Sequence, residues 1–161
     1  MNSRLIKIAF TCCVGLYVIL VCFNNLSDTH SNLQFVSKVA TMEDTFSKAR
    51  NGWRSVNYSF LHQLLFVLIV AWEALMAVLL VAGAVKMIRR LHAPAIEFAK
   101  AKRTASLGLA LGVLLWFFVF ISIGGEWFLM WQSKNWNAQS TAFFLTCCFL
   151  LFLIYLNQED R

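Results

Sequence analysis

Apolar residues gather into four long blocks along this chain, separated by polar segments. The blocks cover about residues 5–23, 60–85, 104–124 and 138–156. A helix needs roughly 20 apolar residues to cross a hydrocarbon core about 30 Å thick, and each block has about this length. The pattern predicts an all-α membrane protein: a single domain over residues 1–161, built as a four-transmembrane-helix bundle.

The composition excludes two other classes of protein. The chain is 60% hydrophobic and only 14% charged, whereas a soluble domain carries about 25% charged residues. The formal net charge is +6, but the basic residues flank the apolar blocks. They form no basic face with interleaved aromatic residues, so we expect no nucleic-acid partner.

Lysine and arginine are distributed unequally between the two sides of the bundle. One side receives nine of the 14 and the other side five. The side rich in basic residues is normally cytoplasmic, so both termini and the inner loop, 86–103, are predicted to lie inside. The inner-loop cations are expected to contact the anionic inner leaflet: Lys86, Arg89, Arg90, Lys100, Lys102 and Arg103.

The outer loop, residues 24–58, is predicted to be partly helical. Its apolar positions recur at the three- and four-residue spacing of an amphipathic helix: Phe35, Val39, Met42 and Phe46. Ser31 and Gln34 fit a capping box at the start of such a helix. The helix could lie on the bilayer surface or cap the bundle. A cap is favoured, because the loop must return to the second span and carries few basic residues.

A second outer segment contains Trp127, Trp131 and Trp136. An indole at the membrane interface buries its ring and keeps its N–H in water, so these residues are predicted to form an interface belt. A platform on which a ligand stacks is the alternative. Trp127 and Trp131 are one helical turn apart, which predicts that the third helix continues beyond the hydrocarbon core.

Glu73 interrupts the second apolar block. It lies about nine residues deep, or roughly 14 Å at the rise of an α-helix, where a charged acid costs about 2.5–3.5 kcal/mol. Depth indicates Thr146 and Tyr17 as hydrogen-bond partners for a neutral carboxyl group. A contact with another subunit and a role in proton or ion transfer stay open. His62 is on nearly the same helix face but about 16 Å away, too far for a direct relay.

Gly108 and Gly112 form a GxxxG pattern in the third block, which predicts close helix packing within the bundle or with a neighbour. The chemistry-bearing motifs that we sought are missing from the sequence. It contains no Ser-His-Asp arrangement, P-loop, dinucleotide fingerprint or carboxylate–His cluster. We therefore predict no catalytic residue, cofactor or metal.

Several segments resemble a known family. They are NNLSD at 24–28, SNLQFVSKVATMEDTF at 31–46, GWR at 52–54, WE at 72–73 and GGEWFLMWQSKNWNAQSTAF at 124–143. Together they resemble the bacterial predicted small integral membrane protein family (domain of unknown function 2165), over nearly the whole chain. The resemblance implies a four-span protein of the bacterial inner membrane. It supplies no activity, catalytic residue or cofactor.

The leading hypothesis is a non-enzymatic accessory or structural subunit of an inner-membrane complex. The sequence lacks a catalytic set, and no span holds a basic residue deep enough to pair with Glu73. The expected partners are the lipid bilayer and other membrane subunits or further copies of the chain. The alternative is a proton- or ion-coupled transporter or channel component that uses Glu73.

Overall fold

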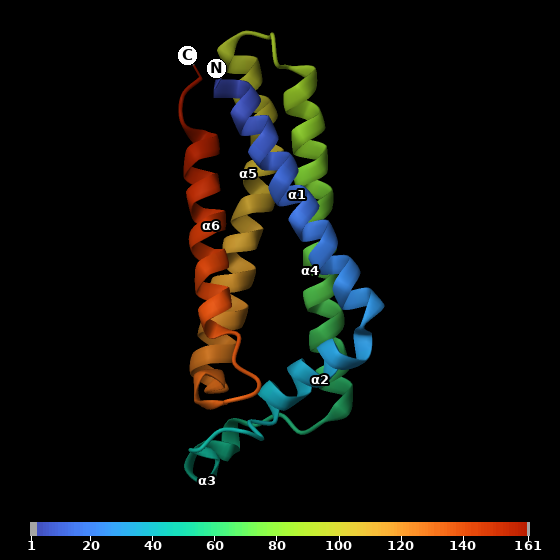
Figure 1. Ribbon diagram of the computed structural model, residues 1–161, viewed down its shortest axis with the longest axis vertical. Coiled ribbons are helices and arrows are strands. Elements are labelled where there is room, and N and C mark those ends of the chain that lie inside the picture. Colours follow the sequence, from blue (N-terminus) through green and yellow to red (C-terminus); the bar gives the residue numbers. More distant parts are fainter. Residues whose placement is uncertain (1–2, 161) are drawn as a thin grey trace.

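Four long helices form an elongated bundle in the computed structural model, which describes residues 3–160 (Figure 1). They are α1 (Ser3–Ser27), α4 (Ser59–Arg89), α5 (Ala95–Val113) continued by η2 (Leu114–Trp127), and α6 (Gln139–Asn157). Each of the four is long and apolar enough to cross a membrane, and residues 3–160 contain no strand. The predicted all-α four-span bundle is confirmed, and each predicted span overlaps one of these helices.

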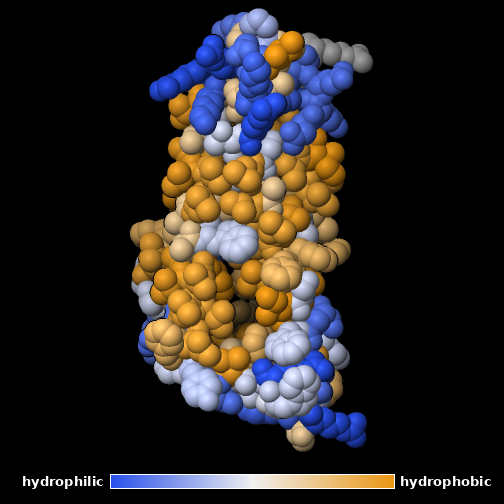
Figure 2. All heavy atoms as spheres, turned by 180° about the vertical axis from the view of Figure 1, so that it is seen from behind, coloured by the Kyte–Doolittle hydropathy of each residue, from blue (hydrophilic) through white to orange (hydrophobic). Residues whose placement is uncertain are grey.

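The bundle has two different ends. Residues near both ends of the chain and the turn between α4 and α5 lie together at one end (Figure 1). We call this the basic end, because it carries most of the lysine and arginine residues. The opposite, capped end is covered by four short elements: α2 (Thr29–Ala40), α3 (Lys48–Asn51), η1 (Gly52–Arg54) and η3 (Met130–Gln132). Figure 2 shows polar surface at both ends and an apolar band between them.

Small residues let the central helices approach closely. A Cβ atom added at Gly83 of α4 would lie 2.5 Å from the backbone nitrogen of Ala105 in α5. The predicted packing glycines also serve this bundle. An added Cβ on Gly108 would lie 3.0 Å from Leu80 in α4, and one on Gly112 would clash with the edge of the Phe149 ring in α6.

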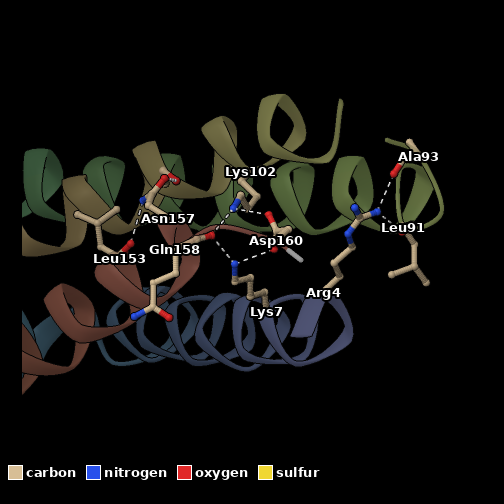
Figure 3. A network of polar contacts seen from close by, with 10 residues as sticks. Arg4, Lys7, Leu91, Ala93, Lys102, Leu153, Asn157, Gln158 and Asp160 are labelled. Carbon is tan, nitrogen blue, oxygen red and sulfur yellow. Dashed lines mark hydrogen bonds and ion pairs between the residues drawn. The ribbon is translucent and has the colours of Figure 1, made fainter. Parts of the chain in front are cut away.

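Two buried lysines hold the C-terminal segment against the basic end (Figure 3). Lys7 of α1 and Lys102 of α5 bond different oxygens of the Asp160 carboxylate, at 2.7 and 2.6 Å. Both ammonium groups also donate to the carbonyl oxygen of Gln158. Burial by itself raises the pKa of Asp160, but the hydrogen bonds from Lys102 and Lys7 outweigh it and hold that pKa below its usual range.

Lys102 therefore differs from its prediction. Its side chain is 5% exposed and bonds inside the bundle, away from lipid headgroups. The other five predicted inner-leaflet residues are exposed at the basic end. Sequence reasoning treated all six as one loop, whereas Lys102 lies on the face of α5 that turns toward α1 and Asp160.

The loop helix is confirmed, with different bounds from those predicted. Its first turn is capped by Asp28, whose carboxylate accepts a hydrogen bond from the Ser31 backbone nitrogen, so the predicted Ser31–Gln34 box is wrong. The helix ends at Ala40, and Met42 has a positive φ of 54°. Met42 and Phe46 therefore lie beyond the helix that their spacing predicted.

Three aromatic pairs join the two loops of the capped end. Each tryptophan of the second loop meets an aromatic ring of the first in an edge-on arrangement. The pairs are Trp127 with Trp53, Trp131 with Phe46, and Trp136 with Phe35. Trp127 and Trp131 are nevertheless about half exposed, so they can also reach the membrane interface.

Hydrogen bonds to Asp44 also connect the same two loops. One of its carboxylate oxygens accepts hydrogen bonds from the Ser133 hydroxyl and from the backbone nitrogens of Lys134 and Asn135. These bonds, that of Ser133 foremost, hold the pKa of Asp44 below its usual range. The loops are thereby tied into one cap.

Candidate functional site: a cleft around Glu73

Glu73 is buried at the middle of α4, where its side chain turns into the bundle. The residue is 2% exposed. The side-chain amide of Asn25, near the end of α1, donates a 2.7 Å hydrogen bond to its Oε2. Asn25 can approach because α1 crosses α4 obliquely (Figure 1), which brings the polar end of α1 to the level of Glu73.

The partners predicted from depth are not those observed. The Thr146 hydroxyl donates to the carbonyl oxygen of Ala142 within α6, and Tyr17 is 39% exposed. Counting residues along α4 gives a depth only if all helices stand upright and parallel. The oblique path of α1 breaks that assumption and places Asn25 beside Glu73.

A cavity of about 240 Å³ with a partly polar lining opens beside this pair. Its polar lining comprises Glu73, Asn25 and Asn32, and Trp116 of η2 forms part of the wall. Trp116 is 9% exposed, and among residues 3–160 no acceptor bonds its buried Nε1. By contrast, Nε1 of Trp72 donates to the Leu111 carbonyl oxygen at 3.1 Å. Trp116 thus lines this cavity and also holds a buried hydrogen-bond donor that no acceptor among residues 3–160 bonds.

A second cavity of about 220 Å³ adjoins the first and is almost wholly apolar. It lies between α4 and η2, with Leu68 and Trp72 on one side and Val119 and Ile123 on the other. Figure 2 shows a hollow in the apolar band at the corresponding height, between the middle of the bundle and the capped end.

The two cavities share four wall residues: Phe35, Val36, Ile69 and Phe120. Phe35 and Val36 belong to α2, Ile69 to α4 and Phe120 to η2. We call the two cavities together the Glu73 cleft. It has a polar part at Glu73 and an apolar part between α4 and η2, and α2 contributes to the wall of both.

The third span changes its winding where it lines this cleft. From Leu114 to Trp127 it is a π-helix, in which each backbone nitrogen bonds the carbonyl oxygen five residues earlier. The Ser122 hydroxyl reaches back to the Phe117 carbonyl oxygen in the same register. Such segments are rare and frequently occur at functional sites. No pattern in the apolar sequence distinguishes this winding from an ordinary α-helix.

His62 has a structural role at the edge of α2. It is 6% exposed; its Nε2 lies 2.8 Å from the Val56 carbonyl oxygen and its Nδ1 3.0 Å from the Ser37 hydroxyl. Because a carbonyl oxygen only accepts, Nε2 carries a proton and donates. His62 therefore ties α2 to the start of α4, and sequence reasoning did not foresee this contact.

The Glu73 cleft offers a shaped cavity and hydrogen-bonding groups. A carboxylate oxygen accepts several hydrogen bonds, and Asn25 supplies one of those to Glu73. The part of the chain described, residues 3–160, brings together no group of three His, Cys, Asp or Glu side chains that could hold a metal ion.

Comparison with protein-family models gives a match over residues 3–159, to domain of unknown function 2165, a predicted small integral membrane protein. The chain belongs to this family. The resemblance noted in the sequence is thus confirmed, and with it the membrane location. Neither the curated proteins nor the solved structures contain a match to the chain.

Proposed function

We propose that the protein is a non-enzymatic membrane protein that binds an amphipathic molecule in the Glu73 cleft, with a hydroxyl head at Glu73 and an apolar chain between α4 and η2. One observation carries this proposal. Glu73, a buried acceptor, and Trp116 line the same cavity, Nε1 of Trp116 is a buried donor without an acceptor among residues 3–160, and an apolar cavity adjoins the first.

The numbers of hydrogen-bond donors and acceptors favour a hydroxyl head group over an ammonium or a carboxylate head group. A hydroxyl group can donate to Glu73 and accept from Trp116 at the same time. An ammonium group has no acceptor, so it would leave the Trp116 N–H unpaired. A carboxylate head would place a second acid beside Glu73, where like charges repel.

The apolar part of the cleft supports a ligand that arrives from the membrane. Leu68 at its wall is 54% exposed, so the cleft opens on the surface that contacts lipid. Pockets for small molecules are typically about 300–1,000 Å³. Neither cavity, at about 220 and 240 Å³, reaches this range alone, but the two together fall within it.

Photolabelling tests the proposal directly. The purified protein in lipid nanodiscs is exposed to a long-chain alcohol bearing a diazirine at mid-chain, and the labelled peptides are mapped by mass spectrometry. We expect label on α4 and η2 residues of the cleft. A matched amine and a matched carboxylic acid should label these positions several-fold less.

Two tryptophan substitutions provide the control. Leu68→Trp fills the apolar part of the cleft and should abolish cleft labelling, whereas Val78→Trp, on the same helix at a 64% exposed position, should leave it intact. Label spread evenly over lipid-facing residues and unaffected by Leu68→Trp would refute the proposal.

A role as accessory subunit of a bacterial inner-membrane complex remains part of our expectation. Its basis has changed, because Asn25 now gives Glu73 a partner within the chain. A bound lipid in the cleft suits such a subunit, which could present it to a neighbouring protein. Native purification in mild detergent should then recover a stoichiometric membrane partner; a clean monomer or a self-oligomer would contradict the subunit role.

Transport through Glu73 has weaker support. On the basic side of Glu73 the buried face of α4 continues with Met76, Ala77 and Leu80, which are between 0% and 9% exposed. A proton or ion would need polar groups or water along this stretch. Equal proton flux in liposomes for the native protein and Glu73→Gln would exclude Glu73 from transport.

A further inference from the structure

A pocket at the basic end holds an unusual concentration of positive charge. It has a volume of about 350 Å³ and lies where α4 ends and α5 begins. The lining residues are Lys86, Arg89, Arg90, Glu97, Lys100 and Ala101. Four basic side chains thus face one carboxylate, and this site is separate from the Glu73 cleft.

The charges in this pocket are poorly compensated. Glu97 pairs with Lys100 at 2.8 Å, and Lys86 donates to the Thr104 hydroxyl at 2.9 Å. Within residues 3–160, no carboxylate lies within ion-pair distance of Arg89 or Arg90. Glu97 also interacts electrostatically with Arg90, so this one carboxylate is shared between Lys100 and Arg90, and the pocket keeps a clear excess of positive charge.

Three other basic residues at this end have hydrogen-bond acceptors within the protein. Lys7 and Lys102 share Asp160, and Arg4 donates to the carbonyl oxygens of Leu91 and Ala93 at 2.8 and 2.7 Å (Figure 3). The fold thus provides acceptors for these three. Among residues 3–160, Arg89 and Arg90 have no hydrogen-bond acceptor of this kind, although they lie at the same end of the bundle.

An ordinary role in helix stability accounts for only part of this arrangement. Cations in the last turn of a helix offset the negative end of its dipole, and Lys86 and Arg89 occupy the last turn of α4. That role needs neither a pocket nor Lys100, which comes from the next helix. A recess between two helices lined by both arginines and lysines indicates a ligand with several acceptor oxygens.

We propose that this pocket binds the phosphate group of an anionic phospholipid. Guanidinium groups match phosphate with paired hydrogen bonds, so Arg89 and Arg90 would hold its oxygens, and Lys86 would add a compact charge. Basic pockets between membrane helices bind anionic lipid headgroups in this way. Ile88 and Ile96, exposed at 53% and 71% on the two flanking helices, offer apolar surface to the acyl chains.

The test measures binding to the whole protein in mild detergent by native mass spectrometry. The probes are short-chain phosphatidylglycerol, short-chain phosphatidylcholine and glycerol 3-phosphate. We expect phosphatidylglycerol to bind and the zwitterionic lipid to bind far more weakly. Glycerol 3-phosphate binding as tightly as the lipid would overturn the proposal by showing that a free phosphate ester is the ligand.

Single substitutions separate a built site from diffuse charge. Arg89→Gln and Arg90→Gln should each weaken phosphatidylglycerol binding about fivefold, the effect of about one surface cation. Arg103→Gln removes an exposed cation at the same end but outside the pocket, and should leave affinity nearly unchanged. An equal loss in all three variants, or no binding by the native protein, would refute the pocket.

Discussion

Asn25 donates a 2.7 Å hydrogen bond to Glu73 across 48 positions of the chain. This bond ties the end of α1 to the middle of α4, and it gives a buried acid a partner that its own helix lacks. Because the same acid lines the polar part of the cleft, this hydrogen bond also fixes where an incoming head group would find its acceptor.

Replacing Asn25 by Leu should destabilise the protein by about 1–3 kcal/mol, because it leaves the buried Glu73 carboxyl without its donor. Thermal unfolding in detergent measures the effect. Asn24→Leu changes an exposed neighbour and serves as the matched control. If both variants unfold alike, the Asn25–Glu73 bond contributes nothing to stability.

Trp116→Phe should leave the stability unchanged or raise it slightly, because it removes a buried N–H that lacks a partner. The same change should reduce labelling of the cleft by the long-chain alcohol, since the hydroxyl loses its donor. Trp72→Phe is the comparison: it removes a paired N–H and should lower the stability. A drop in stability for Trp116→Phe without loss of labelling would contradict the role of Nε1.

Asp160→Asn should destabilise the bundle by about 3–5 kcal/mol, because it leaves two buried lysines without a counterion. Glu159→Gln, an exposed neighbour, should have little effect. A triple variant, Lys7→Met, Lys102→Met and Asp160→Leu, should recover much of the lost stability, because replacing a whole buried ionic group by apolar residues is often tolerated. Chemical unfolding compares all three variants; an unaffected Asp160→Asn would exclude a stabilising network.

Gly83→Ala should destabilise the protein by about 1–3 kcal/mol, as overpacked cores do. The added methyl group would lie 2.5–2.7 Å from atoms of Ala105, including its backbone N and Cα. The backbone of a packed helix cannot relieve such a clash by changing rotamer, as a side chain can. At Gly15, in contrast, the nearest atom would be 3.5 Å away. Gly15→Ala should therefore be neutral or stabilising by up to about 1 kcal/mol. Melting temperatures of the two variants measure the difference in stability. Equal changes at both positions would contradict the close approach of α4 and α5.

Acid should loosen the cap. Hydrogen bonds from Ser133 and Asn135 keep the pKa of Asp44 below its usual range. A carboxyl whose pKa is lower in the folded state stabilises the fold above the unfolded pKa, about 4 for Asp. This contribution is lost as the pH falls through the lower, folded pKa. Tryptophan fluorescence should therefore change below about pH 4, and not near neutrality.

Two variants assign that transition. Asp44→Asn should show the loosened cap at neutral pH, with the acid step gone. Glu43→Gln, which affects only the exposed pair with Lys38, should keep the native acid step. An unchanged acid step in Asp44→Asn would assign it to another group.

Helix number and approximate bounds were predictable because a membrane span is a local property of 20 or so consecutive residues. The partner of Glu73 was not, because it depends on how α1 tilts across α4. Lys102 shows the same limit: its charge is evident in the sequence, but its partner Asp160 lies 58 positions away. Met42 fitted a helical spacing, yet the helix ends before it.

The packing role of some glycines, but not of all, was predictable from the sequence. Gly108 and Gly112 follow a spacing that indicates packing, and both pack inside the bundle. The closest approach of two helix backbones, at Gly83, belongs to a single glycine opposite an alanine and has no spacing of its own. The cleft itself depends on the π-helical winding of Leu114–Trp127, which the apolar pattern does not specify. It depends as well on α2, which the spacing predicted as a helix but did not place against α4 and η2.

The three aromatic pairs of the cap can form only late in the synthesis of the chain. Phe35, Phe46 and Trp53 leave the ribosome before the second span, whereas their partners Trp127, Trp131 and Trp136 follow the third. Until then the three rings of the first loop lack these contacts, although Phe46 and Trp53 remain 76% and 72% exposed even in the complete fold. A chain halted after its second span would therefore lack all three contacts between the loops, so the cap can form only after the third span has been synthesised.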